Sequence, residues 1–354
     1  MTRARDIAGG FDSRKNVIIN GDMKVAQRGT SFVSLANNTY VMDRWVYGKS
    51  GIVVHTVTQE TTGGPNDNFP NWVKLNVTTA DASLTGSDHC YLEQRVEGYN
   101  YLSIREKEVA ISFWVRDAKT GLHAVTLRSG DGLSSYISEY TITQADTWEY
   151  KTVTVIMSEA FGTWNLTNGS GFYLDFILAT GPNFQNTANT WVNAAAFGTS
   201  STVNSVDNTS NVFGVTGVQL EIGSSATAFE YRPIEEEVAL CYRYYIKYPD
   251  NDSFGSTFTG IAAGMQDNST DARFIVQFPV EMRVAPTVSI SGSGNLRVSG
   301  AGTFQSVTGL NNSWTGKRSC MVETTGPSVH PAGRGVVLNR NSNVIGYMDF
   351  DAEL

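Results

Sequence analysis

Charged residues are scarce in this chain of 354 residues. Asp, Glu, Lys and Arg make up 17% of it, against about 25% in a typical soluble protein. The formal net charge is −8, whereas a nucleic-acid-binding surface needs clustered Lys and Arg that displace counterions from phosphates. We therefore expect apolar burial to supply the stability, and we expect no nucleic-acid partner.

Cysteine and long apolar runs are also scarce. Cys90, Cys241 and Cys320 lie far apart and match no CxxC or Cys/His metal spacing, so we expect buried free thiols and no oxidising compartment. Nowhere does the chain offer the roughly 18 apolar residues that a membrane span needs. The basic N-terminal segment MTRARDIAGGFDSRKN is not followed by the apolar region of a signal peptide. The sequence thus predicts a soluble protein, without membrane insertion, that signal peptidase does not process.

No catalytic motif is complete. The GKS of Gly48–Ser50 matches the end of a P-loop, but Asp43 stands where that motif needs its first glycine. There is no GxSxG or HExxH motif, and the histidines are dispersed singly. Two loop carboxylates that lie close together in space could still hydrolyse a glycoside, and a sequence alone does not show such a pair. We therefore predict that the protein is not an enzyme and needs no catalytic cofactor.

Apolar and polar residues alternate from residue 16 to about 232, as expected for strands with one buried face. Val109, Ile111, Phe113 and Val115 form one apolar face, and the segment GFYLDFILA forms another. Turn-like segments such as DAKTG and SGDG separate these runs, with no helical pattern between them. The pattern predicts an all-β fold, with an antiparallel jelly-roll β-sandwich over 16–232 and a C-terminal β-sandwich domain over 250–354.

The segment EYRPIEEEVALCYRYYIKYP, residues 230–249, breaks this pattern. Pro233 fits the first position of a helix, three glutamates follow in its first turn, and Pro249 ends it. The sequence therefore predicts a short connecting helix over 233–249. Four of its residues have the spacing of a coiled-coil seam, so the helix packs on its own domain or on copies of itself: Ile234, Val238, Cys241 and Tyr245.

Aromatic residues in or beside loops are candidates for sugar binding, because their flat faces can stack on sugar rings. Phe184 and Trp191 lie in the polar stretch 180–211, which is long enough for a functional loop. Trp164 lies in the segment SEAFGTWNLTNGSG, and Trp148 precedes it. The alternative is that these side chains cap the edges of the sandwich.

Three stretches together resemble a widespread family of bacteriophage tail fibres and related virion appendage proteins. They are NVIINGDMKVAQRGTSF leading to YVMDRW, then GVTGVQLEIGSSATAFEYRPIEEEVALCYRYY, and FPVEMRVAPTVSI. The family's sandwich opens with an N-hydrophobic-IxNGxF…QRG strand and closes with QLExG…ATxFExR. Met23 and Val25 stand near a position that is usually aromatic in the family, and no long shaft precedes the sandwich. The resemblance therefore implies a short appendage.

What the resemblance implies is a homotrimeric virion structural protein, made in the host cytoplasm and displayed on the tail or another external appendage. The N-terminal segment 1–15, with Arg3 and Arg5, would dock on other virion proteins, and the helical seam would form the trimer interface. The family's sandwiches are similar to carbohydrate-binding modules, in which a structural calcium often joins the first and last strands. The matching oxygen donors here are Asn20, Asp22 and Glu221.

Two functions stay open at this point. In the first, the protein is a tail fibre or short appendage that adheres to bacterial surface polysaccharide through shallow aromatic surfaces, with avidity multiplied by the trimer. In the second, it is a non-receptor structural protein of the virion, such as a head decoration or a fibre adaptor, with no glycan site. A depolymerase is the third and weakest interpretation.

Overall fold

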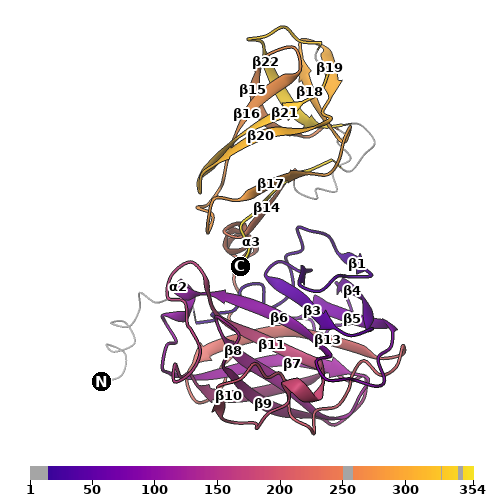
Figure 1. Ribbon diagram of the computed structural model, residues 1–354, viewed down its shortest axis with the longest axis vertical. Coiled ribbons are helices and arrows are strands. Elements are labelled where there is room, and N and C mark those ends of the chain that lie inside the picture. The colour runs from indigo at the N-terminus through magenta and orange to yellow at the C-terminus, as the bar shows by residue number, and fades with distance from the viewer. Residues whose placement is uncertain (1–14, 250–257, 328, 342–345) are drawn as a thin grey trace. The chain divides into compact units, whose positions relative to one another are not determined.

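The computed structural model describes residues 15–249, 258–327, 329–341 and 346–354 of the chain (Figure 1). Its helices are few and short, and every ladder between named strands is antiparallel, which confirms the predicted all-β class. The chain divides into two compact units, residues 1–237 with Leu354, and residues 238–353. The predicted docking residues Arg3 and Arg5 lie outside the described residues.

The first unit contains two antiparallel sheets. The six-stranded sheet has the order β1 (Ser31–Val33), β4 (Val54–Glu60), β5 (Trp72–Thr79), β13 (Val212–Ile222), β7 (Glu108–Asp117) and β10 (Glu149–Ile156). The seven-stranded sheet has the order β12 (Trp191–Val192), β9 (Ser135–Ile142), β8 (Gly121–Ser129), β11 (Ser170–Thr180), β6 (His89–Glu97), β3 (Trp45–Ser50) and β2 (Thr39–Tyr40). The α-helix α2 (Gly98–Tyr101) and the 3-10 helix η1 (Pro182–Phe184) complete it.

The core of the first unit lies between the inward faces of these sheets. Ile111 and Phe113 of β7 are fully buried, as are Leu174 and Phe176 of β11, and the rings of Phe113 and Phe176 lie 4.9 Å apart. The alternation in the sequence works because successive side chains of a strand point to opposite faces. Each large apolar side chain buried in this way contributes about 1.5–3 kcal/mol. The antiparallel β-sandwich predicted for this region is confirmed.

The connecting helix is shorter than predicted. Helix α3 (Ile234–Tyr242) ends at Tyr242, and the next residues form strand β14 (Tyr245–Tyr248), which pairs with β23 (Met348–Asp351). Tyr and Ile favour strands, and a partner strand at the far end of the chain satisfies the backbone. The predicted helix over 233–249 is therefore wrong beyond Tyr242.

The predicted helical seam also fails as a single stripe. Tyr245 lies on a strand, not on the helix, and both Tyr245 and Cys241 are buried in the chain itself. Val238 is half-buried, and Ile234 is exposed. Two of the four side chains are therefore buried within one chain, and the four residues do not lie along one face of a helix.

The second unit contains a large and a small sheet. The seven-stranded sheet has the order β19 (Thr303–Ser306), β18 (Leu296–Gly300), β22 (Gly335–Arg340), β15 (Gly260–Gln266), β16 (Asp271–Gln277), β21 (Ser319–Thr325) and β20 (Gly309–Thr315). The three-stranded sheet has the order β14, β23 and β17 (Thr287–Ile290). Phe274 and Leu338 of the large sheet share one hydrophobic core with Ile246 and Phe350 of the small one.

Two expectations about the whole chain can be compared with the structure. Cys90, Cys241 and Cys320 are buried thiols that form no disulfide, as the sequence predicts. Within the described ranges, no helix combines the length and the apolar character that a membrane crossing requires.

Candidate functional site

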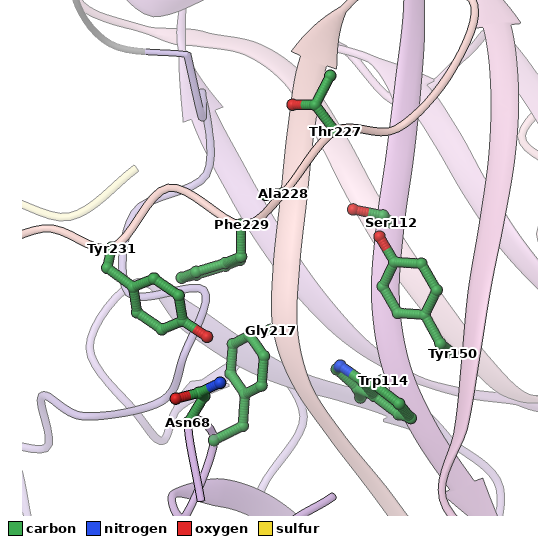
Figure 2. Close-up of a pocket in the computed structure, with 10 residues that line it drawn as sticks. Asn68, Ser112, Trp114, Tyr150, Gly217, Thr227, Ala228, Phe229 and Tyr231 are labelled. Carbon is green, nitrogen blue, oxygen red and sulfur yellow. The ribbon is translucent and has the colours of Figure 1, made fainter. Parts of the chain in front are cut away.

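A groove of about 440 Å³ lies on the outward face of the six-stranded sheet (Figure 2). Strands β7, β10 and β13 form its floor, and the segments before β5 and after β13 form its walls. We call it the aromatic groove, and it is lined by Asn68, Phe69, Ser112, Trp114, Tyr150, Gly217, Thr227, Ala228, Phe229 and Tyr231. Half of these residues are aromatic, and none carries a charge.

The floor of the aromatic groove depends on strand alternation. Phe113 and Val115 point into the core, so Trp114 between them points outward. The β7–β10 register places Tyr150 opposite Trp114, and their ring centroids lie 5.3 Å apart. Figure 2 shows the indole nitrogen of Trp114 on the side that faces Gly217. The two rings therefore give the groove an aromatic floor with a hydrogen-bond donor at one edge.

A bulge in β13 makes room for this floor. The register between β13 and β7 shifts between Thr216 and Gln219, and Gly217 within the shift has a φ of +62°. Glycine adopts such a φ without the strain that a Cβ brings. A Cβ at Gly217 would also lie 3.0 Å from a ring carbon of Phe69 and 3.2 Å from one of Trp114. The bulge thus lets both rings approach the backbone.

One wall is the segment that follows β13 and turns back over it. The backbone N–H of Thr227 donates to Oε1 of Glu221 (2.7 Å), and its hydroxyl donates to Oε2 (2.7 Å). The N–H of Glu230 donates to Oε1 of Gln219 (2.8 Å). Both acceptors lie on β13, so these bonds fix the segment against the sheet on either side of Phe229.

The anchored wall completes an aromatic cluster. The ring of Phe69 lies 5.0 Å from Phe229 and 5.5 Å from Tyr231, and Phe229 and Tyr231 lie 5.0 Å apart, measured between centroids. Tyr231 is exposed along part of its ring. Burial of the remainder raises the pKa of Tyr231 above its ordinary value, so the hydroxyl keeps its proton at neutral pH and can donate a hydrogen bond.

This arrangement suits a neutral ligand with both apolar faces and hydroxyl groups. Aromatic rings supply contact area, while the Trp114 N–H and the tyrosine hydroxyls supply directional hydrogen bonds. The lining contains no His, Cys, Asp, Glu, Lys or Arg. The groove therefore offers aromatic contact surface and neutral hydrogen-bonding groups.

The aromatic residues predicted from loops lie in three separate places. Trp164 and Trp191 are neighbours, with centroids 5.4 Å apart. Trp148 packs edge-on against Trp72 at 5.2 Å, and its indole N–H donates to the carbonyl of Gly63. None of them lines the aromatic groove.

Phe184 belongs to a second, smaller core on the outward face of the seven-stranded sheet. Its ring lies 5.0 Å from Phe197 and 5.2 Å from His89. Phe197 in turn packs with Ala124 and Ile177 of the strands beneath. For Phe184 and Phe197, the structure matches the alternative interpretation, in which the aromatics of the long loop cover the sandwich.

The sequence did carry a signal for part of the groove. Trp114 is a large aromatic residue at an outward position of the strand EVAISFWVRD, opposite in phase to Ile111 and Phe113. A ring on the face that the alternation assigns to solvent is a candidate contact residue. The other aromatic residues of the groove gave no such signal, because Phe69, Phe229 and Tyr231 lie outside the strands.

The residues matched to a structural calcium form contacts within the protein. Oδ1 of Asn20 accepts the N–H of Val25 (2.9 Å), and both carboxylate oxygens of Glu221 accept hydrogen bonds from Thr227. Asp22 pairs with Lys24 at 2.7 Å. Among the residues that the structure describes, no group of three or more His, Cys, Asp or Glu could hold a metal ion. These donors serve to hold the first strand region and the end of β13 in place.

No protein-family model matches the chain, and no curated protein matches its sequence. Among solved structures, the enzymatically active domain of tailspike protein 4 from bacteriophage CBA120 is 14% identical, with a TM-score of 0.32, over 59% of this chain and 21% of that one. The chain thus corresponds to about a fifth of the tailspike chain.

Carbohydrate-binding modules are also similar in fold. TmCBM61 in complex with β-1,4-galactotriose is 11% identical, with a TM-score of 0.30, over 59% of this chain and 100% of that one. The family 11 module from Clostridium thermocellum, in complex with a mixed-linked tetrasaccharide, is 12% identical, with a TM-score of 0.28, over 57% of this chain and 99% of that one. The similarity concerns the β-sandwich fold.

Proposed function

We propose that the protein binds carbohydrate in the aromatic groove and serves a bacteriophage virion as a tail fibre or short appendage that attaches to bacterial surface polysaccharide. The observation that carries the proposal is the lining of the groove, which combines five aromatic side chains with no charged one. A sugar ring offers C–H faces that pack on aromatic rings and hydroxyls that need hydrogen-bond partners. A phosphate or another strongly charged ligand would instead need charged partners in the lining.

The polar atoms at the groove support this proposal. Among the described residues, none forms a hydrogen bond with the Trp114 indole N–H or with the hydroxyls of Tyr150 and Tyr231. The carboxamide of Asn68 lies at the same groove (Figure 2). These groups can therefore form hydrogen bonds with ligand hydroxyls without first breaking hydrogen bonds inside the protein. Once a ligand covers the groove, those bonds also leave no buried polar group without a partner, which favours binding.

The virion role rests on the sequence resemblance described above. In the proposed arrangement the chain is a homotrimer, made in the host cytoplasm, that docks on other virion proteins through its N-terminal segment. A shallow, open groove binds a single glycan weakly, and repeated engagement of a polymer by linked copies raises the overall avidity. A head decoration or fibre adaptor would lack the glycan affinity, so binding measurements separate the two roles.

Tyr150→Ala is expected to weaken binding to a polysaccharide ligand by about fivefold or more, because truncation of a central aromatic contact removes more than about 1 kcal/mol. The matched control is Tyr99→Ala. Tyr99 is 54% exposed on α2 and lies outside the groove, whereas Tyr150 is 45% exposed within it. Calorimetry against a panel of purified bacterial surface polysaccharides, with the wild type first, supplies the measurement.

Equal affinities of the two variants would place the sugar elsewhere on the protein. Failure of the wild type to bind any member of a broad panel would contradict the glycan proposal and leave the adaptor role.

A bound polysaccharide is expected to keep its chain length. Glycoside hydrolysis needs two carboxyl groups placed about 5–9.5 Å apart across the scissile bond, and the groove lining contains none. Prolonged incubation with the wild type should release no reducing ends above a boiled-protein control. A steady release would show that the protein is a depolymerase and that the sugar reaches carboxylates outside the groove.

A further inference from the structure

The seven-stranded sheet of the second unit has a buried face and an exposed face. Phe274, Val322 and Leu338 point into the core and are fully buried. Residues of opposite phase point outward, and six of them form what we call the hydrophobic row: Phe304, Val337, Ala263, Ile275, Met321 and Trp314.

Strand register makes these residues a continuous row. Phe304 and Val337 both pair with Ser299 of β18, and Val337 pairs with Ala263. At the other end, Met321 pairs with both Ile275 and Trp314. The pairing of Gly264 with Phe274 sets Ala263 beside Ile275 and joins the two halves. With Ser299 between Phe304 and Val337, the hydrophobic row therefore crosses the whole sheet, a width of roughly 30 Å at about 4.8 Å per strand.

The hydrophobic row is unusually exposed for a contiguous surface. Ile275 and Phe304 are both 60% exposed, and Trp314 and Val337 are exposed as well. Single exposed apolar residues are normal on protein surfaces, but contiguous patches of several hundred Å² mark places where another molecule binds.

We propose that copies of this chain associate through the hydrophobic row. This proposal rests on the proposed function, in which the chain is a homotrimer. It places the contact between copies at the hydrophobic row and not at the predicted helical seam. A pair of such surfaces would bury on the order of 1,000 Å², the size from which specific interfaces begin.

The composition of the hydrophobic row favours protein over sugar as its occupant. Ile275, Val337 and Ala263 lie between the two aromatic ends, and such aliphatic side chains offer no flat face for a sugar ring. They do pack well against other aliphatic side chains, as in the apolar centres of permanent protein interfaces. The row is thus unlike the aromatic groove, whose large contact side chains are all aromatic.

The charges beside the row are compatible with a second copy of the same surface. Arg273 pairs with Glu323 (2.8 Å) and with Asp267 (2.9 Å). Arg297 lies over the ring of Phe304, 5.0 Å from its centroid. Because both signs of charge flank the row, identical surfaces do not repel each other as two acidic faces would.

The test compares the full-length wild type with Ile275→Glu. The matched control is Ile156→Glu, because Ile156 is 64% exposed at the end of β10 in the first unit. Sedimentation velocity at micromolar concentration should show a wild-type species heavier than the 38.6 kDa chain. Ile275→Glu should raise its dissociation constant by about tenfold or more, since a carboxylate in an apolar contact costs several kcal/mol, and Ile156→Glu should not.

Three outcomes would overturn the proposal: a monomeric wild type, an undisturbed Ile275→Glu oligomer, or equal disruption by Ile156→Glu. Circular dichroism checks folding, and Val337→Glu decides the matter if Ile275→Glu fails to fold. Binding of a short, monovalent oligosaccharide separates this proposal from the glycan proposal. A dissociated Ile275→Glu variant should keep the affinity per site, whereas Tyr150→Ala should lose that affinity and keep the assembly.

Discussion

Arg128→Met is expected to lower the free energy of unfolding of the first unit by about 3–5 kcal/mol, because it leaves buried carboxylates without their partner. Nε of Arg128 lies 2.5 Å from Oδ2 of Asp175, and Nη2 lies 2.5 Å from Oε2 of Glu93. Both carboxylates are almost completely buried. Although burial alone would disfavour the charged guanidinium, Asp175 and Glu93 raise the pKa of Arg128 above its ordinary value.

After the substitution, Glu93 and Asp175 differ in the ion pairs that they still form. Glu93 keeps an ion pair with Arg95 at 2.6 Å, whereas the described structure shows no second ion pair for Asp175. Arg128 also lies over the rings of Phe197 (4.8 Å) and Tyr173 (4.9 Å). Methionine retains part of that packing, so most of the expected loss comes from the buried carboxyl group of Asp175, which is left without its partner.

Urea denaturation of the full-length protein, followed by tryptophan fluorescence, measures the change. Arg105→Met is the control, because Arg105 forms a two-pronged pair with Glu159 at a more exposed site, where loss of an ion pair changes stability little. The double variant Arg128→Met with Asp175→Asn should recover part of the loss. If Arg128→Met and Arg105→Met unfold alike, the buried cluster does not stabilise the fold.

Asp117→Asn is expected to gain stability relative to the wild type as the pH rises from about 4 to about 7. Oδ2 of Asp117 lies 3.8 Å from Nδ1 of His123, and both atoms are buried without another hydrogen-bond partner in the described structure. Nε2 of His123 donates to the carbonyl of Lys119 (3.0 Å), which leaves Nδ1 as an acceptor in the neutral ring. Burial raises the pKa of Asp117 to about 7 and lowers that of His123 to about 4.

The sign of the effect follows from proton counts. An ordinary Asp has a pKa near 3.8 and an ordinary His one near 6.5. Stability from the raised pKa of Asp117 is present below pH 3.8 and is lost as the pH rises through 7. Stability from the lowered pKa of His123 is present above pH 6.5 and is lost as the pH falls through 4. Between about pH 4 and 6.5 the two slopes cancel in the wild type, because folding only moves one proton from His123 to Asp117.

Asn removes the Asp117 contribution and leaves that of His123. The relative gain of the Asn variant should reach a few kcal/mol at pH 7.5, because each tenfold change in the proton affinity of a group corresponds to about 1.4 kcal/mol. Denaturation at pH 4.5 and at pH 7.5 measures it, with Asp67→Asn at an exposed carboxylate of the first unit as the control. A stability difference between Asp117→Asn and wild type that is the same at both pH values would contradict the raised pKa of Asp117.

The sandwich of the first unit was predictable because its information is local. The buried face of β7 can be read from four alternating residues, and the same holds for β11. The end of α3 was not predictable in this way, since Tyr245 to Tyr248 become a strand only through their pairing with residues 348–351. A partner about 100 residues distant leaves no mark on the local pattern.

The candidate site shows the same limit more strongly. The outward position of Trp114 follows from alternation, but Phe69, Phe229 and Tyr231 join it only because a bulge and a turned-back segment bring them together. The loop aromatics Trp148, Trp164, Phe184 and Trp191 share composition with a binding surface, yet backbone geometry distributes them over separate clusters. The sequence shows the aromatic content, whereas convergence in three dimensions determines which rings line the groove.

The residues that attach the groove wall to the sheet are different from the residues that face the groove. The wall is fixed through Glu221 and Gln219, which lie on β13, while Phe229 and Tyr231 between and beside the anchors face the groove. Substitutions at 229, 231, 68 or 150 can therefore change the shape of the cleft while the anchors and the interior of the sandwich stay as they are. A scaffold of this kind suits rapid diversification, and a library randomised at those four positions is a direct route to variants that differ in their preference among the proposed sugar ligands.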